Sequence, residues 1–155
     1  IVKYGELTLR ENQIAYAEPS FFRLFDFELL KGDKKTCLSM PGQVVITERI
    51  ASKYFKDEDP IGKIFIFTGA YDKISCEVTG VMKEMPSNSH IHYSFLISYK
   101  SLPKYMQEYW YKHEAYTYVL LDSPERKAEI EREFPVMAEK YKTDEALKNK
   151  TWGVS

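Results

Sequence analysis

Residues 44–62 read VVITERIASKYFKDEDPIG and contain the signals for a strand, a helix and a turn. After the apolar run at 44–46, apolar residues recur at spacings of three and four, which places them on one side of a helix. They are Ile50, Ala51, Tyr54 and Phe55. Thr47 precedes this helix, where its hydroxyl can accept a hydrogen bond from a free backbone N–H of the first turn. Pro60 cannot continue a helix, so Pro60 and Gly62 turn the chain toward a second apolar run at 64–67.

The composition indicates one globular domain, or two small lobes that share a core. The 155 residues include 12 Tyr and 9 Phe, and such an aromatic content favours strands and partner-facing surfaces. A formal net charge of −1 provides no basic field, which argues against nucleic acid as a partner. No run of 18 apolar residues occurs, so no transmembrane helix is predicted within the chain. Because the chain begins at Ile1 inside a predicted strand, we expect it to be a piece of a longer protein.

Residues 2–33 predict a hairpin followed by an aromatic segment. The alternation in 2–17 flanks a polar tip at 10–13, which is typical of a β-hairpin. Pro19 suits the first turn of a short helix. Five apolar residues follow within 21–27, too many for a solvated loop, so we expect this segment to enter the core. They are Phe21, Phe22, Leu24, Phe25 and Phe27.

Further strands are predicted at 77–82, 92–98 and 115–121. Gly80 inside the first of them indicates a bulge or a close approach of two backbones. Residues 102–111 predict a helix or an irregular segment. Ser123 and Pro124 predict the start of a last helix, which Pro135 should kink. Hairpin-like pairs that alternate irregularly with helices predict an α+β fold and not a wound parallel sheet.

Few residues in the sequence suggest a catalytic or metal-binding role. His90 and His92 are spaced to share one face of a strand, and His113 or Glu114 could complete a metal site with them. Two ligands alone do not make a site, and we favour a structural role for both. The acidic run at 57–59 is interpreted as a solvated helix end and not as a cation site. No phosphate-binding loop and no nucleophile elbow is present, so the sequence predicts no catalytic, cofactor-binding or metal-binding residue.

The two cysteines, Cys37 and Cys76, allow two interpretations. They can be free buried thiols, or they can form a disulfide in an oxidising compartment. Their spacing fits no common zinc pattern, so metal binding by this pair is not expected.

Three groups of segments together resemble the MacB-like periplasmic core domain of ABC transporter permeases, in the FtsX-like permease family. They read AEPSFF at 17–22 with FDFELLKGD at 25–33, then VVITE at 44–48 with KYF at 53–55 and DPIGK at 59–63, and finally VTGV at 78–81 with Pro86 and NSH at 88–90. The similarity covers about residues 14–121. Each piece alone is weak, whereas the order and spacing of all of them are specific. Glu18 stands where the family often has Asp, which is a conservative departure.

This resemblance implies a two-lobed domain on the periplasmic side of the bacterial inner membrane. A porter-like α/β lobe would comprise 1–33 and 92–155, with an inserted mixed α+β lobe at 34–91. The domain would be non-catalytic and would carry no cofactor. It would transmit conformational change from ATP hydrolysis by a cytoplasmic ATP-binding subunit or domain. The full permease would be a homodimer, and its partners would include a periplasmic adaptor, a lipoprotein or a peptide substrate.

Two other classes of function stay open from the residues alone. One is a stand-alone secreted binding module, and the other is a hydrolase with an unrecognised site. An apolar span of about 20 residues upstream of this chain, with further spans downstream, would separate a permease from a secreted module. A deep pocket with a nucleophile and a base would support the hydrolase.

Overall fold

The strand β5 (Gln43–Thr47) lies inside the sheet, and its successive side chains enter two different cores. The computed structural model describes residues 1–69, 73–107 and 115–141. Within it, Val44 and Ile46 belong to one core and Val45 to the other, because successive side chains of a strand point to opposite faces. All three side chains are fully buried. A continuous apolar run in this strand is therefore the signature of a sheet that is covered on both faces.

One mixed sheet of eight strands contains the strands of the described chain, in the order β2-β1-β6-β7-β5-β8-β3, with β4 paired to β7 off this path. The strands other than β5 are β1 (Val2–Tyr4), β2 (Leu7–Leu9), β3 (Ile14–Ala17), β4 (Leu29–Lys31), β6 (Ile64–Thr68), β7 (Lys73–Met82) and β8 (Phe95–Ser98). The β5–β7 and β3–β8 pairs are parallel, and the other pairs are antiparallel. This mixture of short helices and a mixed sheet confirms the predicted α+β class.

The helix α2 (Glu48–Phe55) covers the first core, and its prediction from the sequence is confirmed. The Thr47 hydroxyl accepts a hydrogen bond from the Ile50 backbone N–H at 3.4 Å, as expected of an N-cap. Ile50, Tyr54 and Phe55 are buried against strand residues that include Phe65 and Phe95. The Tyr54 and Phe65 rings meet edge to face with centroids 4.9 Å apart.

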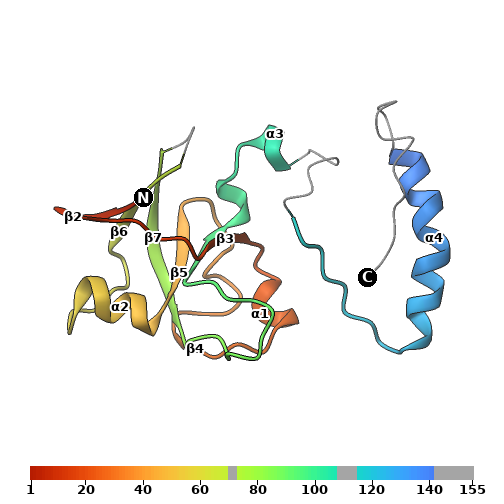
Figure 1. The fold of residues 1–155 in the computed structure, drawn as a ribbon, viewed down its shortest axis with the longest axis horizontal. Coiled ribbons are helices and arrows are strands. Elements are labelled where there is room, and N and C mark those ends of the chain that lie inside the picture. Colours follow the sequence, from red (N-terminus) through yellow and green to blue (C-terminus); the bar gives the residue numbers. More distant parts are fainter. Residues whose placement is uncertain (70–72, 108–114, 142–155) are drawn as a thin grey trace. The chain divides into compact units, whose positions relative to one another are not determined.

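The second core lies on the other face of the sheet, beneath the short helix α1 (Phe21–Leu24) and the connector after β4. Phe22, Cys37 and Leu38 are buried there against Val45 and Leu96. Figure 1 shows α2 and α1 on opposite sides of β5 and β7. Two hydroxyl contacts attach the connector: Thr79 Oγ1 donates to the Cys37 carbonyl at 2.6 Å in a partly buried hydrogen bond, and Ser98 Oγ donates to the Leu38 carbonyl at 2.9 Å in a buried one.

Gly80 is a site of close approach, one of the two situations that the sequence indicated, and it directly follows a bulge. The β5–β7 register shifts between Val44 and Val45, so that Thr79 is the extra residue of a bulge. A Cβ on Gly80 would stand 3.1 Å from Val45 Cγ2 and 3.2 Å from the Lys31 carbonyl oxygen. The bulge therefore requires a residue without a side chain where β4 and β5 approach β7.

The predicted hairpin over 2–17 is wrong in the position of its turn. The hairpin consists of β1 and β2, with Tyr4 opposite Leu7, so the chain reverses at Gly5 and Glu6. Gly5 has a φ of 55°, which a glycine adopts at little cost and which supports a two-residue turn. The polar residues 10–13 are instead a connection to β3, which pairs in parallel with β8.

Two later predictions also need correction. The strand expected at 92–98 begins only at Phe95, so His92 lies in a loop. Residues 115–121 form no strand, because a strand needs a neighbour for its backbone groups and these residues lie exposed, with Leu120 at 74%. After the 3₁₀ turn η1 (Tyr99–Ser101), the segment 102–111, predicted to be helical or irregular, contains the short helix α3 (Lys104–Gln107). Its residues from 108 onward lie outside the described part of the chain.

The chain divides into two compact units, at 1–107 and 108–155. In the second unit, the helix α4 (Glu125–Tyr141) starts one residue after Pro124 and continues through Pro135. No helix within the described ranges is both long enough and apolar enough to cross a membrane.

The sheet combines strands from 1–33, 34–91 and 92–107. The boundary between the two predicted lobes stays a prediction.

Candidate functional site

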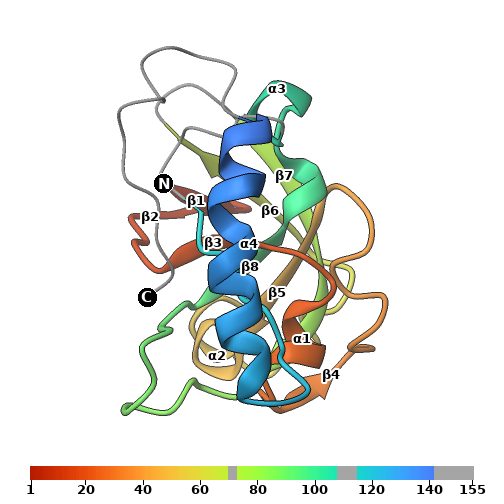
Figure 2. The same ribbon diagram turned by 90° about the vertical axis from the view of Figure 1, so that its right-hand side faces the viewer.

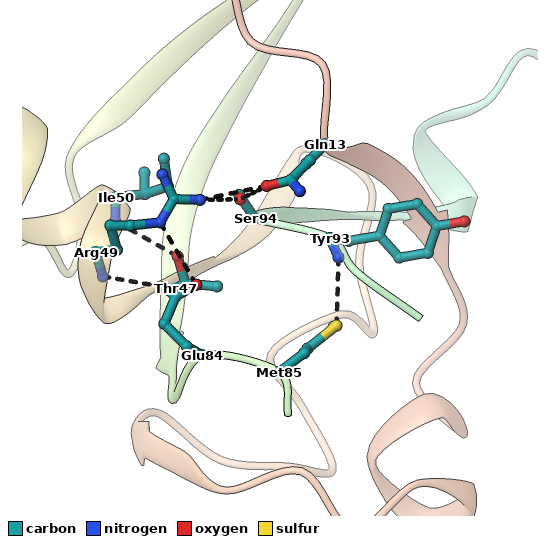
Figure 3. Close-up of polar contacts among 8 residues, drawn as sticks. All are labelled: Gln13, Thr47, Arg49, Ile50, Glu84, Met85, Tyr93 and Ser94. Carbon is teal, nitrogen blue, oxygen red and sulfur yellow. Dashed lines mark hydrogen bonds and ion pairs between the residues drawn. The ribbon is translucent and has the colours of Figure 1, made fainter. Parts of the chain in front are cut away.

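A connected polar site in the first unit surrounds the start of α2. Arg49 and Lys53 lie one helical turn apart, so they project from the same side of the helix. Each contacts the connection at 10–13 between β2 and β3. Figure 3 shows the Arg49 part of this site, which we call the Arg49 cluster and which consists of Gln13, Arg49, Glu84 and Ser94.

The Arg49 guanidinium binds three side chains from distant parts of the sequence. Its Nη2 donates to Ser94 Oγ at 2.8 Å and to Gln13 Oε1 at 3.3 Å, and its Nε lies 3.5 Å from Glu84 Oε2. Ser94 Oγ in turn donates to Gln13 Oε1 at 2.7 Å. The Arg49 backbone N–H also donates to Glu84 Oε1 at 3.3 Å, where a carboxylate is favoured by the free N–H groups of the first helical turn. The cluster thus fixes the first turn of α2 to two loops.

A second contact group lies one turn along the helix, around Glu11. Its carboxylate oxygen accepts hydrogen bonds from Lys53 Nζ at 2.7 Å and from the Tyr54 hydroxyl at 3.0 Å. The Glu11 side chain is only 11% exposed, so this ion pair is better shielded than the ion pair of Arg49 with Glu84. Burial, and then the hydrogen bond to Glu11, raise the pKa of Tyr54. The raised pKa agrees with the Tyr54 hydroxyl acting as the donor in its hydrogen bond to Glu11.

The His90 and His92 side chains lie exposed on the loop before β8. His113 and Glu114 lie outside the described residues, so the complete candidate metal site is not tested. No group of three or more metal-binding side chains is found in the described part of the chain. In the acidic run, Asp59 pairs with Lys31 at 3.0 Å and Glu58 with Lys63 at 2.9 Å. The hydrogen bond from Lys31 is the main cause that lowers the pKa of Asp59.

Both cysteines are free and buried, which agrees with the first of the two interpretations of the sequence. Cys37 belongs to the second core and Cys76 to the first core, on the other face of the sheet. Burial raises the pKa of each thiol to about 11. A raised pKa leaves less of each thiol in the reactive thiolate form at neutral pH.

Sequence reasoning missed the Arg49 cluster. Its contacts span 35 residues to Glu84, 36 to Gln13 and 45 to Ser94, and only the fold brings these positions together. One weak local signal existed, because Arg49 and Lys53 form a basic pair on the polar side of an amphipathic helix. The arrangement joins loops to a helix and holds shape; its described side chains offer no activated nucleophile.

The fold is that of solved permease domains. The chain superposes on the crystal structure of a domain of a protein assigned as a permease from Porphyromonas gingivalis with a TM-score of 0.70 and 21% identity. That superposition covers 93% of this chain and 66% of the other. The periplasmic region of MacB from Actinobacillus actinomycetemcomitans matches with a TM-score of 0.49 and 18% identity, over 64% of this chain and 44% of that one. A search among curated proteins found no match.

The sequence matches the family described as MacB-like periplasmic core domain over residues 1–135. This match spans both the sheet and the greater part of α4. The chain belongs to the MacB-like periplasmic core domain family.

Proposed function

We propose that this chain is the extracytoplasmic part of an ABC transporter permease, and that it transmits conformational change without catalysing a reaction. The observation that carries the proposal is the family match over 1–135. In this role ATP is hydrolysed by a cytoplasmic ATP-binding subunit or domain, and the chain lies on the periplasmic side of the inner membrane. The full permease acts as a homodimer that handles a peptide, a lipoprotein or a periplasmic adaptor.

The construction of the first unit supports a mechanical role. A sheet resists deformation because each strand is hydrogen-bonded to its neighbours, and here both faces of the central strands are covered by packed cores. Movement applied at one edge of such a sheet reaches the other edge with little loss. The two lobes predicted from the sequence, 1–33 with 92–155 and 34–91, would then move largely together where they share the sheet.

Labelling of one exposed position tests the location. Asn88 lies in an exposed turn of the loop before β8, whereas both native thiols are buried. Asn88→Cys in the full-length protein should react with a membrane-impermeant maleimide in cells whose outer membrane has been opened. Reaction only after the inner membrane is also broken would contradict the proposal. The protein without the substitution is the control.

Fractionation of the same cells tests the alternative of a stand-alone secreted module. A permease domain remains with the membrane fraction after cell breakage, because its parent chain carries apolar spans of about 20 residues. A secreted module would be recovered in the soluble periplasmic fraction. Recovery there would overturn the proposed function even if Asn88→Cys were labelled from outside.

A further inference from the structure

The loop 83–94, which joins β7 to β8, forms a wall of the second core. We call this loop the strap; it contains no helix or strand and is the green loop near α2 in Figure 2. Ile91 of the strap is 5% exposed, and Met85 and Tyr93 pack against the second core. The Tyr93 backbone N–H donates to Met85 Sδ at 3.3 Å, which draws the two arms of the strap together (Figure 3).

Arg49 holds both ends of the strap. Glu84 is its second residue and Ser94 its last, and the Arg49 side chain contacts both of them. Arg49 is also the second residue of α2, which covers the first core on the opposite face of the sheet. The Arg49 side chain therefore links α2, which covers one face of the sheet, to the strap, which packs against the core on the other face. Through Gln13 it also reaches the connection that leads into β3.

We propose that Arg49 is a coupling residue that transmits displacement of α2 to the strap and to the start of β3. The inference rests on the proposed function, since coupling of this kind serves a domain that transmits movement. The chemistry suits the role: a guanidinium offers several N–H donors in a fixed plane, so it can bind a carboxylate, a hydroxyl and an amide oxygen at once. A lysine has a single charged centre and cannot hold three partners in fixed directions. Figure 3 shows the three partners arranged around the guanidinium.

Hydrogen exchange of the backbone amides tests the coupling. In Arg49→Met, backbone amides within 84–94 should exchange about fivefold to tenfold faster than in the parent protein. Without the Arg49 contacts, the strap can open locally while the sheet stays folded. Amides of β5 and β7 should keep their exchange rates. Arg49→Lys should recover only part of the protection. Arg126→Met on α4 is a matched control, since Arg126 has a similar exposure of 55% against 53% and also forms ion pairs.

Unchanged exchange in the strap of Arg49→Met would overturn the proposal, and so would equal acceleration in the strap and the sheet. If Arg49→Met does not fold, Glu84→Gln replaces it, because this change removes one charged partner and keeps the shape of the side chain. Glu84→Gln should also accelerate exchange selectively in the strap, and absence of that effect would contradict the proposal. These measurements do not depend on membrane location, so their failure is distinguishable from a failure of the labelling test.

Discussion

The Tyr54 hydroxyl donates a hydrogen bond to the Glu11 carboxylate at 3.0 Å and thereby joins a core residue of α2 to the connection before β3. The ring of Tyr54 packs in the first core, while its hydroxyl reaches the edge where Lys53 binds the same carboxylate oxygen. The pair shows how α2 is fixed on two sides, by apolar packing beneath it and by polar contacts along its flank.

Removal of this hydroxyl should destabilise the domain modestly. Tyr54→Phe keeps the ring in the core and removes one partly buried hydrogen bond, so we expect a loss of about 1 kcal/mol in the free energy of unfolding. Chemical denaturation provides the measurement. Tyr116→Phe is the control, because Tyr116 is 83% exposed and its change should leave stability unaltered. A Tyr54→Phe protein as stable as the parent would show that Lys53 alone satisfies Glu11.

An aspartate inside the first core should strongly destabilise the domain, because its charge is buried. Ile50 is fully buried on the inner side of α2, so Ile50→Asp places an unpaired carboxylate among apolar side chains. We expect a loss of about 4 kcal/mol or more, which approaches the total stability of a small domain. Thermal unfolding measures the effect, and Ser52→Asp on the exposed side of the same helix is the control. Equal melting temperatures for the two variants would mean that α2 faces the sheet in a different way.

Two glycines with positive φ should respond differently to alanine. Gly32 has a φ of 94°, and a Cβ there would stand 2.4 Å from the Thr79 backbone carbonyl oxygen. Gly5 has a φ of 55° and open space around it. Gly32→Ala combines backbone strain with overpacking and should cost about 3 kcal/mol, whereas Gly5→Ala should cost about 1 kcal/mol. Similar losses in the two variants would contradict the close contact of β4 with the bulge on β7.

Stability should fall between about pH 9 and pH 11 because of the buried thiols. Burial raises the pKa of Cys37 and of Cys76 to about 11 from an ordinary value of 9.0. In that window the unfolded thiols lose their protons while the folded ones keep them, so the folded state binds more protons and loses stability as pH rises. The thiol contribution is fully present below pH 9 and is lost as pH passes the folded value. We expect about 3 kcal/mol for each thiol at most, since each unit of pKa difference corresponds to about 1.4 kcal/mol.

The comparison that isolates this effect is the slope of unfolding free energy against pH. Cys76→Ala removes one titrating group, so its stability should fall less steeply than that of the parent protein between pH 9 and pH 10.5. Groups common to both proteins, including Tyr54, contribute equally to the two slopes. Identical slopes would indicate that Cys76 is accessible to water in the folded state.

The sequence correctly predicted the features that depend on residues close together in the chain. Thr47, the apolar spacing of α2 and Gly80 each have a nearby cause, and the structure confirms all three. The hairpin was misplaced because alternation alone does not identify which residues turn, and the glycine at position 5 provided the cheaper reversal. The segment 115–121 has the residues of a strand but no strand in the structure, since pairing depends on a neighbour that composition cannot specify.

The Arg49 cluster was harder to predict from the sequence, because its residues are far apart in the chain and meet only in the fold. Gln13, Arg49 and Ser94 are ordinary polar residues with no motif among them, and they meet because β8 pairs with both β5 and β3. The resemblance carried by the segments at 17–33, 44–63 and 78–90 identified the family correctly. The same resemblance did not point to Arg49.

Transmission of conformational change requires the domain to move as a body when ATP is bound and hydrolysed. Pulsed electron paramagnetic resonance on the full-length permease with its ATP-binding partner measures this, with a spin label at Asp57→Cys, an exposed position after α2. We predict that the distance between the labels of the two copies changes between the nucleotide-free and the ATP-bound states. The distance from Asp57→Cys to Thr8→Cys within one domain should stay constant. An unchanged distance between the copies in the two states would contradict the proposed transmission.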